Sequence, residues 1–427
     1  MIVLFDKIED RLDDESQRKV AAFIADHADD IFEFTCALIR TPSVNPPGDE
    51  VAVSKVVMDR LAQLGIEDCS IAACLPERPN VMAHVAGTSP GPTLMLSGHL
   101  DTKPAGNMDE WETDPWVPMV VGDQLVGLGS GDMKASIAAM VYAAAALRHL
   151  GEFPGKLSLA LTADEENGSQ YGSKWLAAEG YLEADVCVIG EPAGVHEEWE
   201  SIHLVSRGAA LFKVVVLGTQ MHSSISDQLP AVNATLKMAE LALKMQRELR
   251  GYLTFDDHEY CRLGPTVNVG VTAEAGVTYG VFPGRAEFGV DVRTIPGMTE
   301  EQVQADVQRF LDDAVASDPE LDAELEWNLM VGATEIDASN PIVQSLADAS
   351  QIVLGHTPRL DAFPGATDAA YIQIVAGVPC IASFGPGFLP RAHSPNESMH
   401  KDGAAEAAMI YALSALDYLN TQTANTP

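Results

Sequence analysis

The sequence predicts an α/β protein with a mainly parallel sheet, interrupted by a smaller inserted α+β domain. The chain has 427 residues, more than a single hydrophobic core usually serves. Strand-like and helix-like segments alternate in its first and last parts, whereas the middle follows another order. Apolar residues make up 47% and charged residues 21%, which is typical of a globular protein. We therefore expect two domains.

The first part of the chain predicts helices followed by alternating strands and helices. Helical apolar spacing extends to about Leu64, interrupted by the loop RTPSVNPPGDE. Four short segments rich in β-branched and apolar residues then predict strands: PNVMAHVAG, PTLMLSGH, GKLSLALTAD and ADVCVIGEP. Between the second and third lies an alanine-rich predicted helix, DMKASIAAMVYAAAALRHLG, which ends at Gly151.

The middle of the chain predicts a ferredoxin-like unit. A strand in LVSRGAALFKVVVLG precedes a helix near 231–249, and strands in TVNVGVTA and GRAEFGVDVRT precede a helix near 299–314 and a strand near ELEWNLM. The order strand, helix, strand, strand, helix, strand is that of the split βαβ motif. We expect an insertion at 203–333, and a first domain formed by 1–202 and 334–427, where helix and strand alternate again.

Charge and the amino-terminal sequence bear on partners and location. The chain has 62 acidic and 26 basic residues, a net charge of −36, which repels nucleic acid and anionic membranes. The start, MIVLFDKIEDRLDDESQRKV, has too short an apolar run and too many acids for a signal peptide. The six cysteines show neither metal-ligand nor disulfide-scaffold spacing. We expect a cytoplasmic protein that binds neither nucleic acid nor membrane.

The segment LMLSGHLDTKPAG begins as a buried strand and ends on two ionisable residues, His99 and Asp101. Side chains two apart on an extended segment point to the same face, so both would enter one space at the strand's carboxyl end. Open α/β sheets build their sites at this edge. For this pair taken alone, a loop histidine beside a turn aspartate is an equally simple interpretation.

Further candidate metal ligands lie at other strand-to-loop junctions: Asp132 in GSGDMK, Glu165 and Glu166 in TADEENG, Glu191 in IGEP, and His393 in RAHSPNE. Each alone is explained by a helix cap, a solvated loop or a turn. Together they predict a centre of histidine nitrogens and carboxylate oxygens, which suits one or two zinc, manganese or cobalt ions. Two such ions, about 3.5–4 Å apart, activate a water and polarise a carbonyl.

Seven motifs together resemble one known group of enzymes: SGHLDT, GSGDMKAS, TADEENGSQYGSKWL, GEP, HSS, DVRTIPG and AHSPNE. From about Leu38 onward the chain is similar to metallopeptidase family twenty, which includes carboxypeptidase G, acetylornithine deacetylase, succinyl-diaminopimelate desuccinylase and aminoacylase. The resemblance implies a catalytic domain of zinc-exopeptidase type, with the inserted domain serving as a lid and as the contact of a homodimer.

The resemblance also implies a role for each candidate in the first domain. Asp132 would bridge two metal ions, and the other ligands would be His99 with Glu191 at one ion and Glu166 with His393 at the other. Asp101 would orient His99, as residues behind metal ligands commonly do. Glu165 would be the general base that takes a proton from metal-activated water.

Two residues of the insertion match family positions. His222 in MHSSIS matches the histidine that reaches the partner subunit's active site and stabilises an oxyanion. Arg293 in DVRTIPG matches the arginine that binds a substrate carboxylate. The alternatives are a locally bonded histidine and a cross-strand ion pair. The turn YGVFP departs from the family, because Gly280 stands where asparagine is usual and Tyr279 and Phe282 add aromatic surface.

These observations leave three functions open. The first is a metal-dependent hydrolase that cleaves an amide C–N bond of a small carboxylate-bearing substrate. The second is an aminohydrolase that releases ammonia from an aromatic amine of the aminobenzoate type, as in nitroaromatic degradation. The third is an inactive metal-dependent binding protein, and the presence of Glu165 with all the ligands argues against it.

Overall fold

The computed structural model describes residues 8–424 and contains two compact units. Unit 1 comprises the chain up to Leu204, Glu335–Phe363 and the chain from Thr367 onward. Unit 2 comprises Val205–Thr334 and Pro364–Ala366. The apolar run MIVLF, on which the signal-peptide argument depends, lies outside the described residues.

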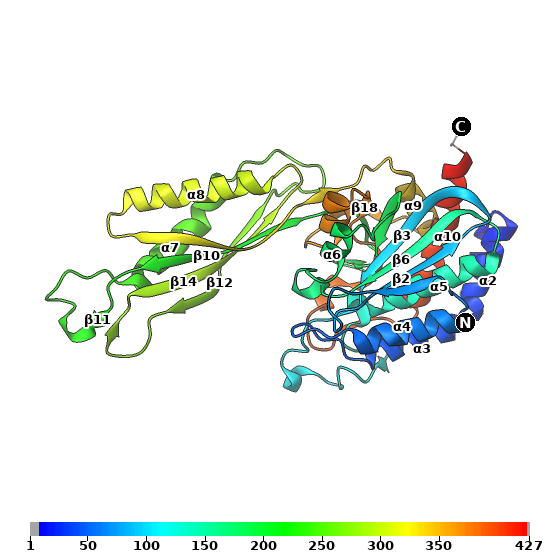
Figure 1. Ribbon diagram of the computed structural model, residues 1–427, viewed down its shortest axis with the longest axis horizontal. Helices are drawn as coiled ribbons and strands as arrows, with labels where there is room; N and C mark the ends of the chain where they lie inside the picture. The colour runs from blue at the N-terminus through cyan, green and yellow to red at the C-terminus, as the bar shows by residue number, and fades with distance from the viewer. Residues whose placement is uncertain (1–7, 425–427) are drawn as a thin grey trace. The chain divides into compact units, whose positions relative to one another are not determined.

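Unit 1 is built on a six-stranded sheet with the order β1-β2-β6-β3-β7-β18 (Figure 1). Its strands are β1 Cys69–Ala72, β2 Asn80–Ala86, β3 Ser89–His99, β6 Pro154–Thr162, β7 Val186–Ile189 and β18 Cys380–Ile381. The β6-β3-β7-β18 pairings are parallel, whereas β1 and β2 pair antiparallel. The predicted α/β fold is confirmed, but the sheet is mixed, because the unpredicted strand β1 and β2 form an antiparallel edge.

Helices cover the sheet of unit 1 and contain much of its core. They are α2 Glu15–Asp26, α3 Ala28–Ile39, α4 Val51–Gln63, α5 Ala135–Leu150, α6 Ser173–Ala178, α9 Pro341–Leu354 and α10 Gly403–Ala424. Every residue of α5 from Ala135 to Leu147 is buried, and α5 contacts both α10 and the sheet. The many alanines of α5 permit this close packing on several sides, which a single apolar stripe would not require.

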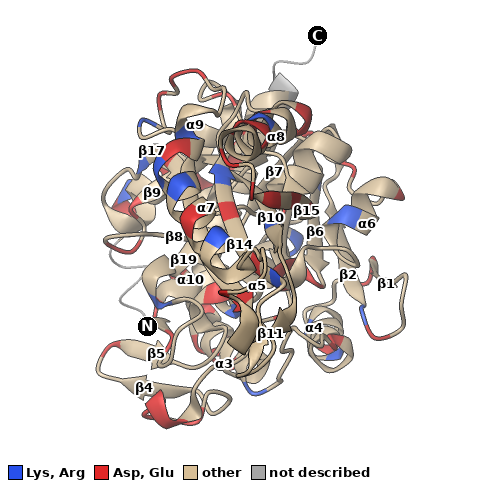
Figure 2. Cartoon of the chain, turned by 90° about the vertical axis from the view of Figure 1, so that its left-hand side faces the viewer, with Lys and Arg blue, Asp and Glu red and all other residues tan. Residues whose placement is uncertain are grey.

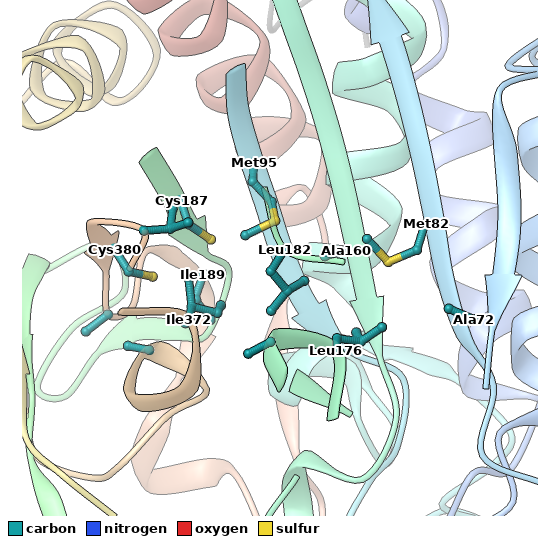
Figure 3. Close-up of a cluster of buried hydrophobic side chains, with 14 of the residues drawn as sticks. Ala72, Met82, Met95, Ala160, Leu176, Leu182, Cys187, Ile189, Ile372 and Cys380 are labelled. Atoms are coloured by element: carbon teal, nitrogen blue, oxygen red, sulfur yellow. The ribbon is translucent and has the colours of Figure 1, made fainter. Parts of the chain in front are cut away.

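A second hydrophobic cluster packs against the same sheet (Figure 3). Met95 belongs to it, whereas Leu94 and Leu96 point to the opposite face because side chains alternate along a strand. Sheet residues such as Met82, Ala160, Cys187 and Ile189 meet Leu176, Leu182 and Ile372 there. With both faces buried, the buried parts of the parallel strands are mostly apolar.

Shorter strands complete unit 1 and its junctions with the insertion. Three small sheets are formed by β4 Met119–Val121, β5 Gln124–Val126 and β20 Ser398–His400; by β8 Pro192–Gly194 and β19 Gly385–Phe388; and by β9 Ser201–Ser206, β16 Thr334–Glu335 and β17 Arg359–Phe363. The antiparallel β5-β20 pairing fixes the segments that precede Asp132 and follow His393.

Unit 2 has the predicted ferredoxin-like order of elements. Its sheet, β12-β14-β10-β15, is antiparallel throughout and consists of β10 Gly208–Leu217, β12 Thr266–Ala275, β14 Arg285–Thr294 and β15 Asp322–Val331. The helices α7 Ala234–Glu248 and α8 Glu300–Ser317 pack on this sheet. A separate two-stranded antiparallel sheet pairs β11 Met221–His222 with β13 Val281–Phe282.

In Figure 2 the acidic residues are spread over helices and loops rather than gathered in one segment. Among residues 8–424, no helix combines the length and the apolar character needed to cross a membrane. All six cysteines are free thiols.

Candidate metal centre

The parallel strands β3, β6 and β7 end at one edge of the sheet and bring three predicted segments together. His99, the last residue of β3, pairs in register with Thr162, the last residue of β6. A 3₁₀ turn, Glu165–Asn167, follows β6, and Glu191 follows the end of β7. This is the edge at which the sequence placed the site.

Asp132 lies between the two predicted histidine ligands. It belongs to an irregular turn before α5, Ser130–Lys134, and its backbone leaves the helical region at φ −122° and ψ 89°. Its Oδ1 atom is 3.0 Å from Nε2 of His99, and its Oδ2 atom is 3.1 Å from Nε2 of His393. One carboxylate therefore contacts both histidines, one through each oxygen.

The remaining predicted ligands complete the cluster. Nε2 of His393 is 3.2 Å from Oε2 of Glu166, and Nε2 of His99 is 3.5 Å from Oε1 of Glu191. Two overlapping sets of donor atoms each lie within 4.8 Å of one another: His99, Asp132 and Glu166, and His99, Glu165 and Glu191. Nitrogen and carboxylate donors in this number fit zinc, manganese or cobalt.

Opposite charges perturb the histidines and Asp132. Burial lowers the pKa of His99, but hydrogen bonds with Asp101, Asp132 and Glu191 raise that pKa well above its ordinary value. Burial also lowers the pKa of His393, but its contacts with the Asp132 and Glu166 carboxylates raise that pKa to about 11. Burial raises the pKa of Asp132, and the two histidines outweigh it and lower that pKa. Carboxylates outnumber imidazoles here, so the cluster attracts cations.

Glu165 is half-buried as a residue, whereas the other carboxylate residues of the cluster are buried. Burial, followed by the charge of Glu191, raises its pKa well above the ordinary range. Burial and the charge of Asp132 raise the pKa of Glu191 to about 7. A raised pKa makes a carboxylate a stronger base, which favours proton transfer from water in general base catalysis.

Asp101 is fully buried and holds two neighbouring segments. The closer acceptor for Nδ1 of His99 is the main-chain oxygen of Asp101, at 2.9 Å, while the Asp101 carboxylate is 3.5 Å away. That carboxylate accepts the backbone N–H groups of Glu165 at 3.2 Å and Glu166 at 3.1 Å. Asp101 therefore contacts the histidine and fixes the turn that carries both glutamates.

A buried ion network behind Asp101 was not predicted from the sequence. Arg78 donates to both oxygens of Glu50, at 2.8 and 2.9 Å, and to Oδ1 of Asp164 at 2.8 Å. The side-chain amide of Asn45 donates to Asp101 at 2.8 Å and to Asp164 at 2.9 Å. No local pattern reveals the pairing of Arg78 with Glu50, because the pair forms only in the folded chain.

Two more unpredicted groups contact the site. Lys103, within the segment LMLSGHLDTKPAG, donates its backbone N–H to Oε1 of Glu166 at 3.1 Å, and its ammonium lies 3.3 Å from Oε2. Asp368 is buried and accepts the hydroxyls of Thr162 at 3.2 Å and Ser173 at 2.6 Å, as well as that of Ser169. Asp368 thus ties the end of β6 to the start of α6.

The two predicted residues of unit 2 have local contacts. His222 is exposed, and its Nδ1 accepts the backbone N–H of Ser224 at 3.2 Å and lies 2.8 Å from the Ser224 hydroxyl. The Arg293 guanidinium is paired with Asp291 two residues earlier on β14, at 2.8 and 2.9 Å. The side chain of Arg293 is 31% exposed, so one side of its fork stays accessible.

Comparison with known protein families gives a match to Peptidase family M20/M25/M40 over residues 95–417. The chain belongs to this family. Two similar curated relatives are succinyl-diaminopimelate desuccinylases. The protein of Leptothrix cholodnii is 30% identical over 364 residues, 82% of this chain and 88% of that protein. The protein of Aromatoleum aromaticum is 30% identical over 394 residues, 89% and 94% of the two chains.

Solved structures confirm the fold of this M20 family member. An M20 family metallo-carboxypeptidase of Sulfolobus solfataricus has a TM-score of 0.73 and 20% identity, covering 91% of this chain and 99% of that chain. A Bacillus subtilis dinuclear metal binding peptidase of the family has a TM-score of 0.64 and 17% identity, covering 94% and 99%. Family membership confirms the predicted class, a metal-binding hydrolase of C–N bonds, and these relatives give no support to ammonia release from an aromatic amine.

Proposed function

We propose that five residues of unit 1 would hold two divalent metal ions: His99 and Glu191 would serve one ion, Glu166 and His393 the other, and Asp132 both. The observation that carries this proposal is the Asp132 carboxylate, whose two oxygens lie 3.0 and 3.1 Å from the two histidines. Zinc, manganese and cobalt are the ions suited to these donors. Such ions, when bound, polarise a carbonyl and lower the pKa of water.

Residues of unit 1 then have separate roles in amide hydrolysis. Glu165 accepts the proton of the attacking water and returns it to the leaving nitrogen, a role that its raised pKa supports. Asp101 and the main chain around it hold His99 and the turn of the two glutamates in place. The same cluster therefore positions both the ligands and the base.

The substrate that best fits is a small N-acyl amino acid carrying a further carboxylate. The relatives named above are desuccinylases of such a compound, and Arg293 presents a planar guanidinium that suits two carboxylate oxygens. A substrate carboxylate would share Arg293 with Asp291 or displace it.

A substrate screen tests this proposal. Chelator-treated protein is reloaded with zinc, manganese or cobalt and offered N-succinyl and N-acetyl amino acids, dipeptides and aminobenzoates, and the release of free amine or ammonia is measured. We expect hydrolysis of N-acyl substrates, abolished by chelation and restored by metal. Full turnover of chelated protein, or activity confined to the aminobenzoates, would contradict the proposal.

We further propose a cytoplasmic homodimer formed through unit 2. The strand β12 is an edge of the sheet, and most of its residues are exposed. On α7, which packs on β12, Leu236 and Leu243 are 62% and 61% exposed and lie two helical turns apart, on one face. An exposed edge and an apolar helix face together suit a symmetric contact with a second copy.

His222 is proposed to donate a hydrogen bond to the oxyanion at the partner's metal centre. Because its Nδ1 accepts the N–H of Ser224, the neutral ring carries its proton on Nε2. This tautomer presents a donor to solvent or substrate from an exposed loop. A donor of this kind stabilises charge that develops only in the transition state.

A further inference from the structure

Glu397 is a buried carboxylate with no role in the mechanism described above. It is the last residue of the motif AHSPNE, four residues after His393, and is 2% exposed. Its Oε1 atom accepts the backbone N–H groups of Gly131 at 2.9 Å and Asp132 at 3.0 Å. Its Oε2 atom accepts the N–H of Gly129 at 3.1 Å.

The backbone of the segment that carries Asp132 is bonded partly within the segment and partly to Glu397. The turn Ser130–Lys134 is irregular, with Asp132 and Met133 outside the helical region. Within the segment, main-chain oxygens accept two N–H groups of this turn: Gly127 accepts that of Ser130 at 3.1 Å, and Gly129 accepts that of Lys134 at 2.8 Å. A buried N–H group without an acceptor costs roughly as much as a lost hydrogen bond. The Glu397 side chain accepts two further N–H groups of the turn, those of Gly131 and Asp132, and that of Gly129 just before it, so the conformation that presents Asp132 depends on Glu397.

Glu397 also joins the two segments that carry Asp132 and His393. Its main-chain oxygen accepts the N–H of Gly127 at 3.0 Å, and the strand that follows it, β20, pairs with β5. The backbone thus aligns the two segments, and the carboxylate fixes the turn at its far end. With both segments held in this way, Oδ2 of Asp132 lies 3.1 Å from Nε2 of His393.

We infer that Glu397 is a positioning residue that holds the Asp132 carboxylate in the orientation shared by both histidines. The inference rests on the proposed metal centre. Removal of the Glu397 carboxylate weakens the binding of divalent ions. The fold persists, because the backbone pairing of β5 with β20 still joins the two segments. Loss of a group that supports metal ligands typically weakens metal affinity about 10–100-fold.

The test is a titration of the apo form of the full chain with zinc by calorimetry, comparing wild type with Glu397→Gln. Glutamine keeps one acceptor oxygen but turns an NH₂ group toward the N–H of Gly129. We expect folded protein with zinc affinity about 10–100-fold weaker, and turnover that approaches that of wild type once zinc is saturating. If Glu397→Gln does not fold, Glu397→Asp, which keeps the charge but shortens the reach, takes its place in the same titration.

The matched control is Asp306→Asn in unit 2. Asp306 is also a fully buried carboxylate, and it accepts the backbone N–H of Thr254 at 2.6 Å and the Gln302 amide at 3.0 Å. We expect this variant to retain wild-type zinc affinity. Unchanged affinity in the folded Glu397 variant, or an equal loss in the control, overturns the inference. Wild-type protein that binds no zinc, manganese or cobalt overturns the proposed metal centre itself.

Discussion

Asp101 and His222 both belong to motifs that resemble those of the family, yet their surroundings differ completely. Asp101 in unit 1 is fully buried and accepts hydrogen bonds from Asn45 and from the turn after β6. His222 in unit 2 is exposed, and its ring is bonded to Ser224 in the same turn. The chain itself fixes the geometry of the first residue. A local turn fixes only the tautomer of His222, so the proposed function of His222 requires a second copy of the chain to bring its metal centre close.

The largest expected effect tests how firmly the buried network holds unit 1. Arg78→Met leaves Glu50 and Asp164 buried without their cation, and we expect a loss of about 3–5 kcal/mol in the free energy of unfolding. The control is Lys213→Met in unit 2, whose pair with Glu287 is more exposed, and its effect should be much smaller. Urea denaturation measures both. Equal losses would remove the contrast between the two regions.

The second prediction concerns the base. Glu165→Gln keeps the size of the side chain but cannot accept a proton, so we expect turnover at least about 10²-fold lower, about 2.7 kcal/mol of activation free energy. Metal content, measured by elemental analysis, should stay at the wild-type level. A variant with near-normal turnover would assign proton transfer to another residue.

The third prediction concerns the pH dependence of the free energy of unfolding that the buried His203, which is not one of the predicted metal ligands, contributes. Burial lowers the pKa of His203 to about 4 from its ordinary 6.5. Because the unfolded chain binds this proton more readily, stability is lost as pH falls from 6.5 toward 4, about 2 kcal/mol between pH 7 and pH 5.

His203→Asn removes this titration and can keep a hydrogen bond to Ser383. The difference between the unfolding free energies of wild type and variant, measured by urea denaturation at both pH values, should therefore change by that amount. A difference independent of pH would contradict the prediction.

The last prediction addresses His222 through mixed dimers. A His222→Ala chain and a Glu165→Gln chain should each be nearly inactive alone. In a heterodimer, one active site has an intact Glu165 from the first chain and an intact His222 from the second, so the mixture should recover up to about half of wild-type activity per heterodimer. Labelled subunits confirm exchange. Absence of recovery after proven exchange would place the action of His222 within its own chain.

The sequence was sufficient where a chemical pattern coincides with a strand end. His99 and Asp101 could be placed because side chains alternate along a strand and because the alternation of strands with helices predicts parallel strands, as β3, β6 and β7 are. Only resemblance connected His393 with Glu166, since the two lie 227 positions apart. The ion pair of Arg78 and Glu50 had no local signal, because a buried pair is defined by the segments that the fold brings together.

The division of unit 1 by an insertion has a consequence for biosynthesis. Unit 2 is almost entirely one continuous stretch, Val205–Thr334, so it can fold as soon as it has left the ribosome. Unit 1 must wait, because its edge strand β18, its helix α10 and His393 are all synthesised after the insertion. Until then β7 remains an unpaired edge and the nascent centre lacks one of its two histidines. This order of segments therefore makes the incomplete sheet of unit 1, rather than the insertion, the part that needs chaperone protection.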